Sequence, residues 1–206
     1  MNRTLEHILP RVQKPARYTG GEYNAVVKDR RAVDVRYALC FPDTYEIGMS
    51  NLGVRILYGL MNEMDGVWCE RVFAPWGDME EEMRREGIPL YGLESGDSIA
   101  DFDLIGFSLG YEMAYTNVLN MLDLAGLPLR VVAGGTCAFN PEPLAPFVDL
   151  FVLGEGEDVS VEIIQLYRQA REEGWGKEEF LTAAARIPGV YVPSLYEVSY
   201  HGDGTV

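Results

Sequence analysis

Four short segments of the sequence carry residues whose types suit ligand binding. Residues 43–48 contain the pattern Asp-x-Tyr-x-x-Gly, and residues 108–110, 134–140 and 154–157 are polar or rich in glycine. Glycine lets a ligand approach the backbone closely, while carboxylate, hydroxyl and phenol groups can hydrogen-bond to it. Residues of these types favour a site that binds a ligand noncovalently. The candidate binding residues are Asp43, Tyr45, Gly48, Ser108, Leu109, Gly134, Gly135, Gly154 and Glu155.

The sequence lacks the motifs of several common catalytic and nucleotide-binding sites. There is no GxxxxGK[ST] loop and no GxSxG nucleophile elbow. Val159 stands where a dinucleotide fingerprint starting at Gly154 and Gly156 would need its third glycine. The two histidines, His7 and His201, lie in the two tails, so a Ser–His or Cys–His catalytic pair in the core is not expected. The three cysteines lack metal-ligand spacing, which argues against a zinc or iron–sulfur site made by this chain alone.

The candidate segments are positioned by apolar runs that predict buried strands. Runs at 35–41, 104–109, 131–133 and 150–153 each end where a candidate segment begins or close to it, and 67–73 predicts one more strand. Helical patterns at 51–64, 79–86, 115–125, 160–173 and 177–186 alternate with these runs. Parallel neighbours need helical crossovers, so the alternation predicts a five-stranded, parallel, doubly wound α/β sheet of Rossmann-like type.

The carboxyl ends of parallel strands meet at one edge of a sheet, where ligands of such folds bind. We therefore expect the four segments to form one pocket. The alternative is that they are only tight turns, which use Gly, Asp, Ser and Asn for conformational reasons. The divisions we expect are an irregular arm at 1–32, the α/β domain at 33–175, and a helix with an extended segment at 176–206.

Composition limits the partners and the compartment. The chain has 206 residues, 48% of them hydrophobic, and a formal net charge of −15, so direct nucleic-acid binding is not expected. The first 36 residues differ, with eight basic residues against four acidic ones. No run of about 18 apolar residues predicts a membrane span, and the start resembles no signal peptide. With three scattered cysteines, these features favour a cytoplasmic protein without a disulfide framework.

The patterns resemble those of cobalamin-binding domains. Such domains carry Asp-x-His-x-x-Gly after the first strand, Ser-x-Leu after a middle strand and Gly-Gly after the fourth, on a flavodoxin-like sheet. In that family the glycine-rich loops make room for the nucleotide tail of the cofactor, and the histidine ligates cobalt. Here Tyr45 stands in place of that histidine, and phenols are poor cobalt ligands at neutral pH.

Longer stretches resemble one family of radical SAM proteins with an N-terminal cobalamin-binding-like domain. They include KPARYTGGEYNAVVKD, FPDTYEIGMSNLG, GFSLGYEMAYTNVLNMLDLAG and GGTCAFNPEPLAPFVDLFVLGEGED. In that family a following barrel binds a [4Fe-4S] cluster through Cys-x-x-x-Cys-x-x-Cys, a pattern that this sequence lacks. The resemblance implies that the chain is the N-terminal part of such an enzyme, with cluster and S-adenosylmethionine bound downstream. The family also has a longer loop where Arg130 abuts Val131, so residues could be absent there.

Two functions follow from this resemblance. In the first, the domain binds or presents a corrinoid to the downstream barrel of the same protein, which would transfer a methyl or sulfur group. In the second, it is a cofactor-free docking module that packs on the catalytic domain or on a partner. A pocket for a different flat or phosphate-bearing ligand is a third option. In all three this chain alone supplies no catalytic residue.

Overall fold

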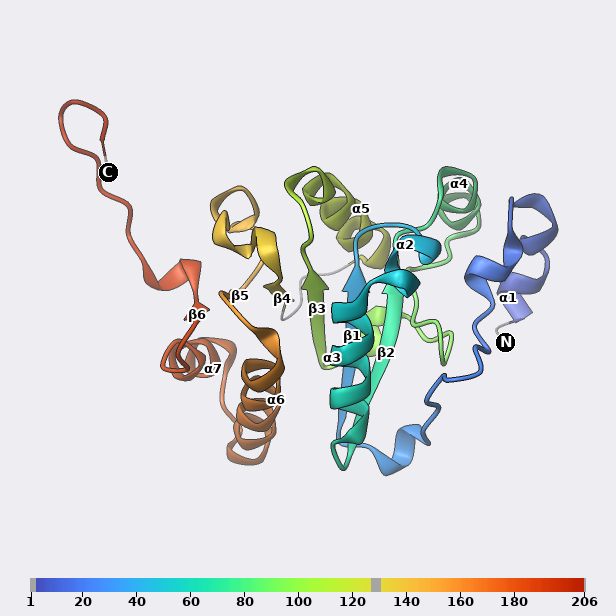
Figure 1. The fold of residues 1–206 in the computed structure, drawn as a ribbon, viewed down its shortest axis with the longest axis horizontal. Helices are drawn as coiled ribbons and strands as arrows, with labels where there is room; N and C mark the ends of the chain where they lie inside the picture. Colours follow the sequence, from blue (N-terminus) through green and yellow to red (C-terminus); the bar gives the residue numbers. More distant parts are fainter. Residues whose placement is uncertain (1–2, 127–130, 206) are drawn as a thin grey trace.

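The computed structural model describes residues 3–126 and 131–205, which fold around one mixed sheet (Figure 1). Within these residues the sheet has six strands in the order β2-β1-β3-β4-β5-β6. β1 to β5 run parallel, so their carboxyl ends meet at one edge, the upper edge in Figure 1. The strands are β1 (Val35–Phe41), β2 (Val67–Phe73), β3 (Leu104–Ser108), β4 (Val131–Gly134), β5 (Leu150–Val152) and β6 (Val190–Tyr191).

The prediction of five strands is corrected by the short strand β6. It pairs antiparallel with β5, through Phe151 with Tyr191 and Val152 with Val190. It lies within the extended segment that the sequence predicts at 176–206, and it adds an edge strand to the five that were expected. The order of the other five strands, 2-1-3-4-5, is a common order of doubly wound sheets.

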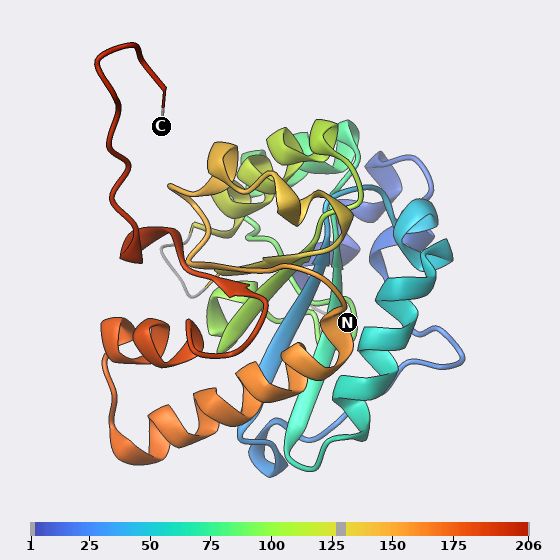
Figure 2. The same cartoon turned by 60° about the vertical axis from the view of Figure 1, so that its left-hand side comes forward.

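Helices cover both faces of the sheet. Buried side chains of α3, α6 and α7 form one core with one face of the strands, and those of α4 and α5 form a second core with the other face. Figure 2 shows α3 and α6 lying on the same side of the sheet. The helices are α1 (Arg3–Glu6), α2 (Tyr45–Ser50), α3 (Leu52–Glu63), α4 (Gly77–Glu86), α5 (Tyr115–Ala125), α6 (Gly156–Glu173) and α7 (Lys177–Ala184). Short 3₁₀ helices include η5 (Glu112–Ala114) and η6 (Thr136–Phe139).

Helix ends follow local signals in the sequence. The Asn51 side chain accepts a hydrogen bond from the Val54 amide at 3.0 Å and caps α3. Gly87, Gly126 and Gly174 adopt left-handed conformations directly after α4, α5 and α6. Two elements differ from expectation: α2 occupies part of the predicted turn at 43–48, and α6 begins at Gly156 instead of residue 160.

The N-terminal arm packs on the face of the sheet that α4 and α5 cover. Leu5, Ile8 and Val12 are buried in the same core as Met83 of α4. The basic residues of the arm meet acidic helices: Arg11 pairs with Glu82 of α4 at 3.1 Å. The arm is therefore draped over this domain, and several of its basic side chains form ion pairs with acidic residues of the domain.

The segment after α6 also joins the core. Phe180, Leu181 and Val192 are buried in the core that contains α3 and α6. The tail beyond residue 195 extends away from the sheet in Figure 2. In the described part of the chain, no helix has the length and apolar character needed to cross a membrane. The junction of Arg130 with Val131, raised by the sequence, involves a residue outside the described ranges.

Candidate functional site

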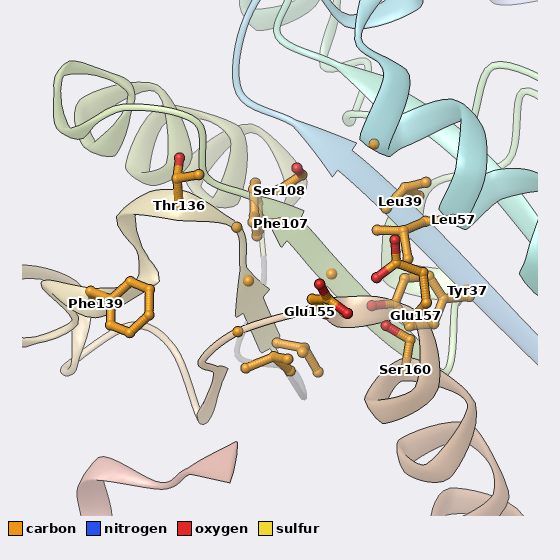
Figure 3. A pocket seen from close by; sticks show the side chains of 18 residues that line it. Tyr37, Leu39, Leu57, Phe107, Ser108, Thr136, Phe139, Glu155, Glu157 and Ser160 are labelled. Atoms are coloured by element: carbon orange, nitrogen blue, oxygen red, sulfur yellow. The ribbon is translucent and has the colours of Figure 1, made fainter. Parts of the chain in front are cut away.

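A pocket of about 450 Å³ opens between the sheet and helices α3 and α6 (Figure 3). Its volume lies within the range of small-molecule sites, roughly 300–1,000 Å³. Four neighbouring parallel strands and the loops at their carboxyl ends supply most of its lining. The lining residues are Tyr37, Leu39, Gly53, Leu57, Gly106, Phe107, Ser108, Val132, Gly134, Gly135, Thr136, Phe139, Val152, Gly154, Glu155, Gly156, Glu157 and Ser160.

The pocket exists because small residues share one face of two adjacent strands. Residues two apart on a strand point to the same face, so Gly106 and Ser108 of β3 face the pocket together. Ser108 pairs in register with Gly134 of β4, which adds a third small residue on this face. Leu39 and Val152 border this hollow, so it has apolar walls.

The candidate glycines have different local roles. A Cβ on Gly134 would come no closer than 3.5 Å to Val152, an ordinary contact, so the space beside Gly134 is open. Gly135 has φ of +102°, and a Cβ there would lie 2.6 Å from the Leu109 carbonyl oxygen. Gly154 has φ of +112° with nothing nearby, so its glycine is required by the backbone conformation. Gly134 is therefore the candidate glycine that leaves room for a ligand.

Leu109 positions two of the loops through its backbone. Its amide donates a hydrogen bond to the Gly134 carbonyl at 2.7 Å, and its carbonyl accepts one from the Cys137 amide at 3.2 Å. The Thr136 hydroxyl also donates to the Gly110 carbonyl at 3.0 Å. The Leu109 side chain is fully buried. These bonds hold the loop after β3 against the loop after β4 and fix that side of the pocket.

Three candidate residues from the first segment do not line this pocket. Asp43 accepts a hydrogen bond from the Tyr111 hydroxyl at 2.5 Å and so links the loop after β1 to the loop after β3. A Cβ on Gly48 would lie 2.2 Å from the ring of Phe73, so that glycine serves packing inside the protein. Tyr45 begins α2 and faces the arm.

The environment of Tyr45 keeps its phenol neutral. The hydroxyl donates to Glu22 Oε1 at 3.0 Å, and the ring packs edge-on against Phe73 with centroids 5.6 Å apart. Burial, followed by the hydrogen bond to Glu22, raises the pKa of Tyr45. A protonated phenol that is held by the arm does not act as a metal ligand. The structure therefore brings Ser108, Gly134, Gly135, Gly154 and Glu155 together and leaves Tyr45 apart from them.

The sequence reasoning missed two polar side chains of the pocket, Tyr37 and Ser160. They are 4% and 9% exposed. A Cβ on Gly106 would lie 1.9 Å from the Tyr37 hydroxyl, so the hydroxyl lies directly against the backbone of β3. Gly106 could have indicated this contact, because a glycine inside a strand often marks a place where another group comes close to the backbone. Ser160 gave none, since a serine in a helical pattern is usually solvated.

The charge around the pocket is negative. Glu155 and Glu157 are its charged lining residues, and none of the described arginine, lysine or histidine residues lines it. Burial raises the pKa of the Tyr37 hydroxyl, with smaller contributions from Cys69 and Cys40, so this group stays protonated. Among the residues that the structure describes, no three His, Cys, Asp or Glu side chains are grouped as a metal site. The pocket thus offers apolar walls, hydroxyl groups and backbone groups to a ligand.

Comparison with known proteins gives two matches. The family described as "Radical SAM proteins, N-terminal" matches residues 53–193, which is more than half of the chain. An uncharacterized protein of Methanocaldococcus jannaschii is 31% identical over 133 residues. That alignment covers 62% of this chain and 26% of the relative, so the matched part is about a quarter of the relative's length.

Proposed function

This chain belongs to the family of N-terminal regions of radical SAM proteins, and we propose that it binds a corrinoid and presents it to a downstream catalytic domain. The observation that carries the proposal is the pocket at the carboxyl ends of β1, β3, β4 and β5. Its position is the one at which doubly wound sheets bind ligands. It is lined by Ser108, Gly134 and Gly135, the positions that match the tail-binding patterns of cobalamin-binding domains.

The residues present suit one part of a corrinoid better than another. The open space beside Gly134 and the apolar walls suit the flat base of the nucleotide tail. A whole corrinoid is larger than the pocket, so only this tail would enter it. Tyr45 does not suit the cobalt centre, because its hydroxyl is hydrogen-bonded to Glu22 and stays protonated. The cofactor would therefore be held by its tail, without a cobalt ligand from Tyr45.

When bound, a corrinoid supplies a carrier for a methyl group. The chain's own part would be to hold the tail and fix its orientation. The Ser108 hydroxyl can hydrogen-bond to the tail, and the backbone around Gly134 can contact it closely. The [4Fe-4S] cluster and S-adenosylmethionine would be bound by the downstream domain of the same protein, so a methyl or sulfur-group transfer would be completed there.

A cofactor-free docking module is the second candidate. The observation that favours it is that Asp43, Tyr45 and Gly48 make contacts inside the protein instead of facing the pocket. In addition, Met113 and Phe139, which follow β3 and β4 at the carboxyl edge, are 84% and 73% exposed. Exposed apolar side chains at one edge are suited to contact with another domain.

A titration with hydroxocobalamin separates the two candidates. Binding should change the visible spectrum and raise the thermal midpoint, since a ligand at 100 times its Kd stabilises a protein by about 2.7 kcal/mol. Gly134→Leu fills the open space and should weaken binding at least tenfold. Gly77→Leu is the matched control, because Gly77 also has no neighbour that its new side chain would strike and does not line the pocket. No change in spectrum or midpoint at high concentration would favour the docking module.

A further inference from the structure

The tail that follows β6 ends in a closed hairpin loop. The His201 amide donates to the Thr205 carbonyl at 2.7 Å, and the Gly204 amide donates to the His201 carbonyl at 2.9 Å. Gly204 is left-handed, with φ of +85°. These two hydrogen bonds and the left-handed glycine are the pattern of a three-residue hairpin loop that ends in a G1 bulge. In Figures 1 and 2 the tail reverses its direction near its end.

Asp203 holds this loop closed. Its carboxylate accepts hydrogen bonds from the Thr205 amide at 3.0 Å and from the Thr205 hydroxyl at 2.7 Å. These two bonds lower the pKa of Asp203, so the carboxylate is ionised at neutral pH. Aspartate and glycine are the residue types that such loops use. Contacts among the residues of the loop are therefore enough to turn the chain back on itself.

The segment before the loop has the pattern of a strand. Residues 196–200 read Tyr-Glu-Val-Ser-Tyr, in which apolar and polar side chains alternate with the period of an extended chain. Tyr196, Val198 and Tyr200 are 63%, 55% and 70% exposed. The Tyr196 ring lies beside Tyr191 of β6, with centroids 5.1 Å apart, so the segment starts at the edge of the sheet. Among the described residues, no strand pairs with this segment.

A hairpin loop joins two strands, and the described residues supply the first. The family is one of N-terminal regions, and the matched part is 26% of the Methanocaldococcus jannaschii relative. We infer that, in the full-length protein, the residues that follow this segment return as an antiparallel strand beside residues 196–200. The connection to the downstream part is then a β-ribbon that starts at the β6 edge instead of a free linker. This inference does not depend on what the pocket binds.

The loop fixes the register of this ribbon. His201 and Thr205 face each other as a hydrogen-bonded pair, and such pairs recur at every second residue of an antiparallel ladder. Counting back from His201, the amides of Ser199 and Glu197 would point toward the returning strand, whereas the amide of Val198 between them would point away. Because the loop places the chain after Thr205 on this side, the following segment is favoured over a strand from a second copy.

Hydrogen exchange of the full-length protein tests this register. We expect the amides of Glu197 and Ser199 to exchange at least about tenfold more slowly than that of Val198, because only the first two are hydrogen-bonded across the ribbon. Electron-transfer fragmentation with mass spectrometry resolves the individual amides. Equally fast exchange of all three, or slow exchange of Val198 alone, would overturn the inference. Protection that increases with protein concentration would assign the partner strand to a second copy and would also overturn it.

Two substitutions in the loop form a matched pair. An added Cβ meets nothing within 4 Å at Gly202 or Gly204, so only the backbone conformation distinguishes the two positions. Gly204→Ala should speed the exchange of the protected amides about tenfold, because the left-handed conformation is unfavourable for alanine. Gly202→Ala should leave them protected, since Gly202 lies outside the left-handed region. The amides of β5 should be unaffected in both variants. If Gly204→Ala has no effect, or if Gly202→Ala has an equal one, the inference fails.

Discussion

At the scale of single residues, two glycines of the pocket face look alike in sequence and differ in what surrounds them. Gly106 and Gly134 are on neighbouring strands and on the same face of the sheet. The Tyr37 hydroxyl occupies the space beside Gly106, whereas the space beside Gly134 is open. One glycine therefore accommodates a protein side chain, and the other leaves volume to the pocket.

This difference predicts opposite effects of one substitution. Gly106→Ala places a methyl group 1.9 Å from the Tyr37 oxygen and should lower the free energy of unfolding, by about 1–3 kcal/mol. Gly134→Ala makes only an ordinary contact and should leave stability unchanged or slightly raised, because glycine inside a strand costs about 0.5–1 kcal/mol relative to alanine. Urea denaturation of the two variants measures both effects. Equal stability losses would contradict the distinction between the two glycines.

At the scale of elements, the arm is attached to α2 by charged side chains. Lys14 and Arg17 each hydrogen-bond to the Glu46 carboxylate, at 3.1 and 2.9 Å. Partial desolvation raises the pKa of Glu46, but the hydrogen bonds from Arg17, its own backbone and Lys14 outweigh it and lower this pKa to about 2. The attachment therefore depends on an ionised carboxylate.

A pH dependence follows for this contact. A pKa that is lower in the folded state stabilises the fold above the unfolded value, and the contribution is lost as the pH falls toward the folded value. We expect the contact between Glu46 and the arm to persist at pH 5 and to weaken as the pH approaches 2. Titration of Glu46 by NMR measures it directly. Arg17→Ala should move the pKa back toward 4.5, whereas Arg11→Ala, which removes a contact with α4 only, should leave it unchanged.

At the scale of the whole molecule, stability depends on a charged group inside the core. The Arg36 guanidinium of β1 donates to Glu70 of β2 at 2.5 Å, and both side chains are almost fully buried. Asp97 contacts the same guanidinium at 2.9 Å, and the ring of Phe102 lies 4.1 Å from it. These contacts connect β1, the edge strand β2 and the segment before β3.

Breaking this buried pair should destabilise the whole domain. Glu70→Gln removes the buried carboxylate that pairs with Arg36 and leaves the guanidinium with the partly exposed Asp97. The loss should be about 3 kcal/mol, at the lower end of the cost of breaking a buried ion pair. Asp123→Asn breaks an exposed pair with Arg84 and should cost about 1 kcal/mol or less. Thermal unfolding of the two variants provides the comparison. A similar small loss for both would show that the Arg36 pair is screened by water.

The sequence by itself predicted most of the elements and the edge at which the pocket lies. Apolar runs and helical patterns have short repeats, so local residues were enough to place β1, β2, α4 and α5 to within two residues at each end. Helical connections between the strands indicated that the strands are parallel. The carboxyl ends of parallel strands lie at one edge of the sheet, so the candidate loops were expected at that edge. The long motifs also indicated the radical SAM family.

Only the tertiary structure decided which residues face the pocket. Tyr37, Gly106 and Ser160 are far apart in the chain and meet because β1, β3 and α6 are packed together. Tyr45 faces the arm instead of the candidate site, because its hydroxyl donates a hydrogen bond to Glu22. The position of Glu22 depends in turn on how the arm packs. The direction of a side chain is set by partners distant in sequence, and a local pattern contains no information about those partners.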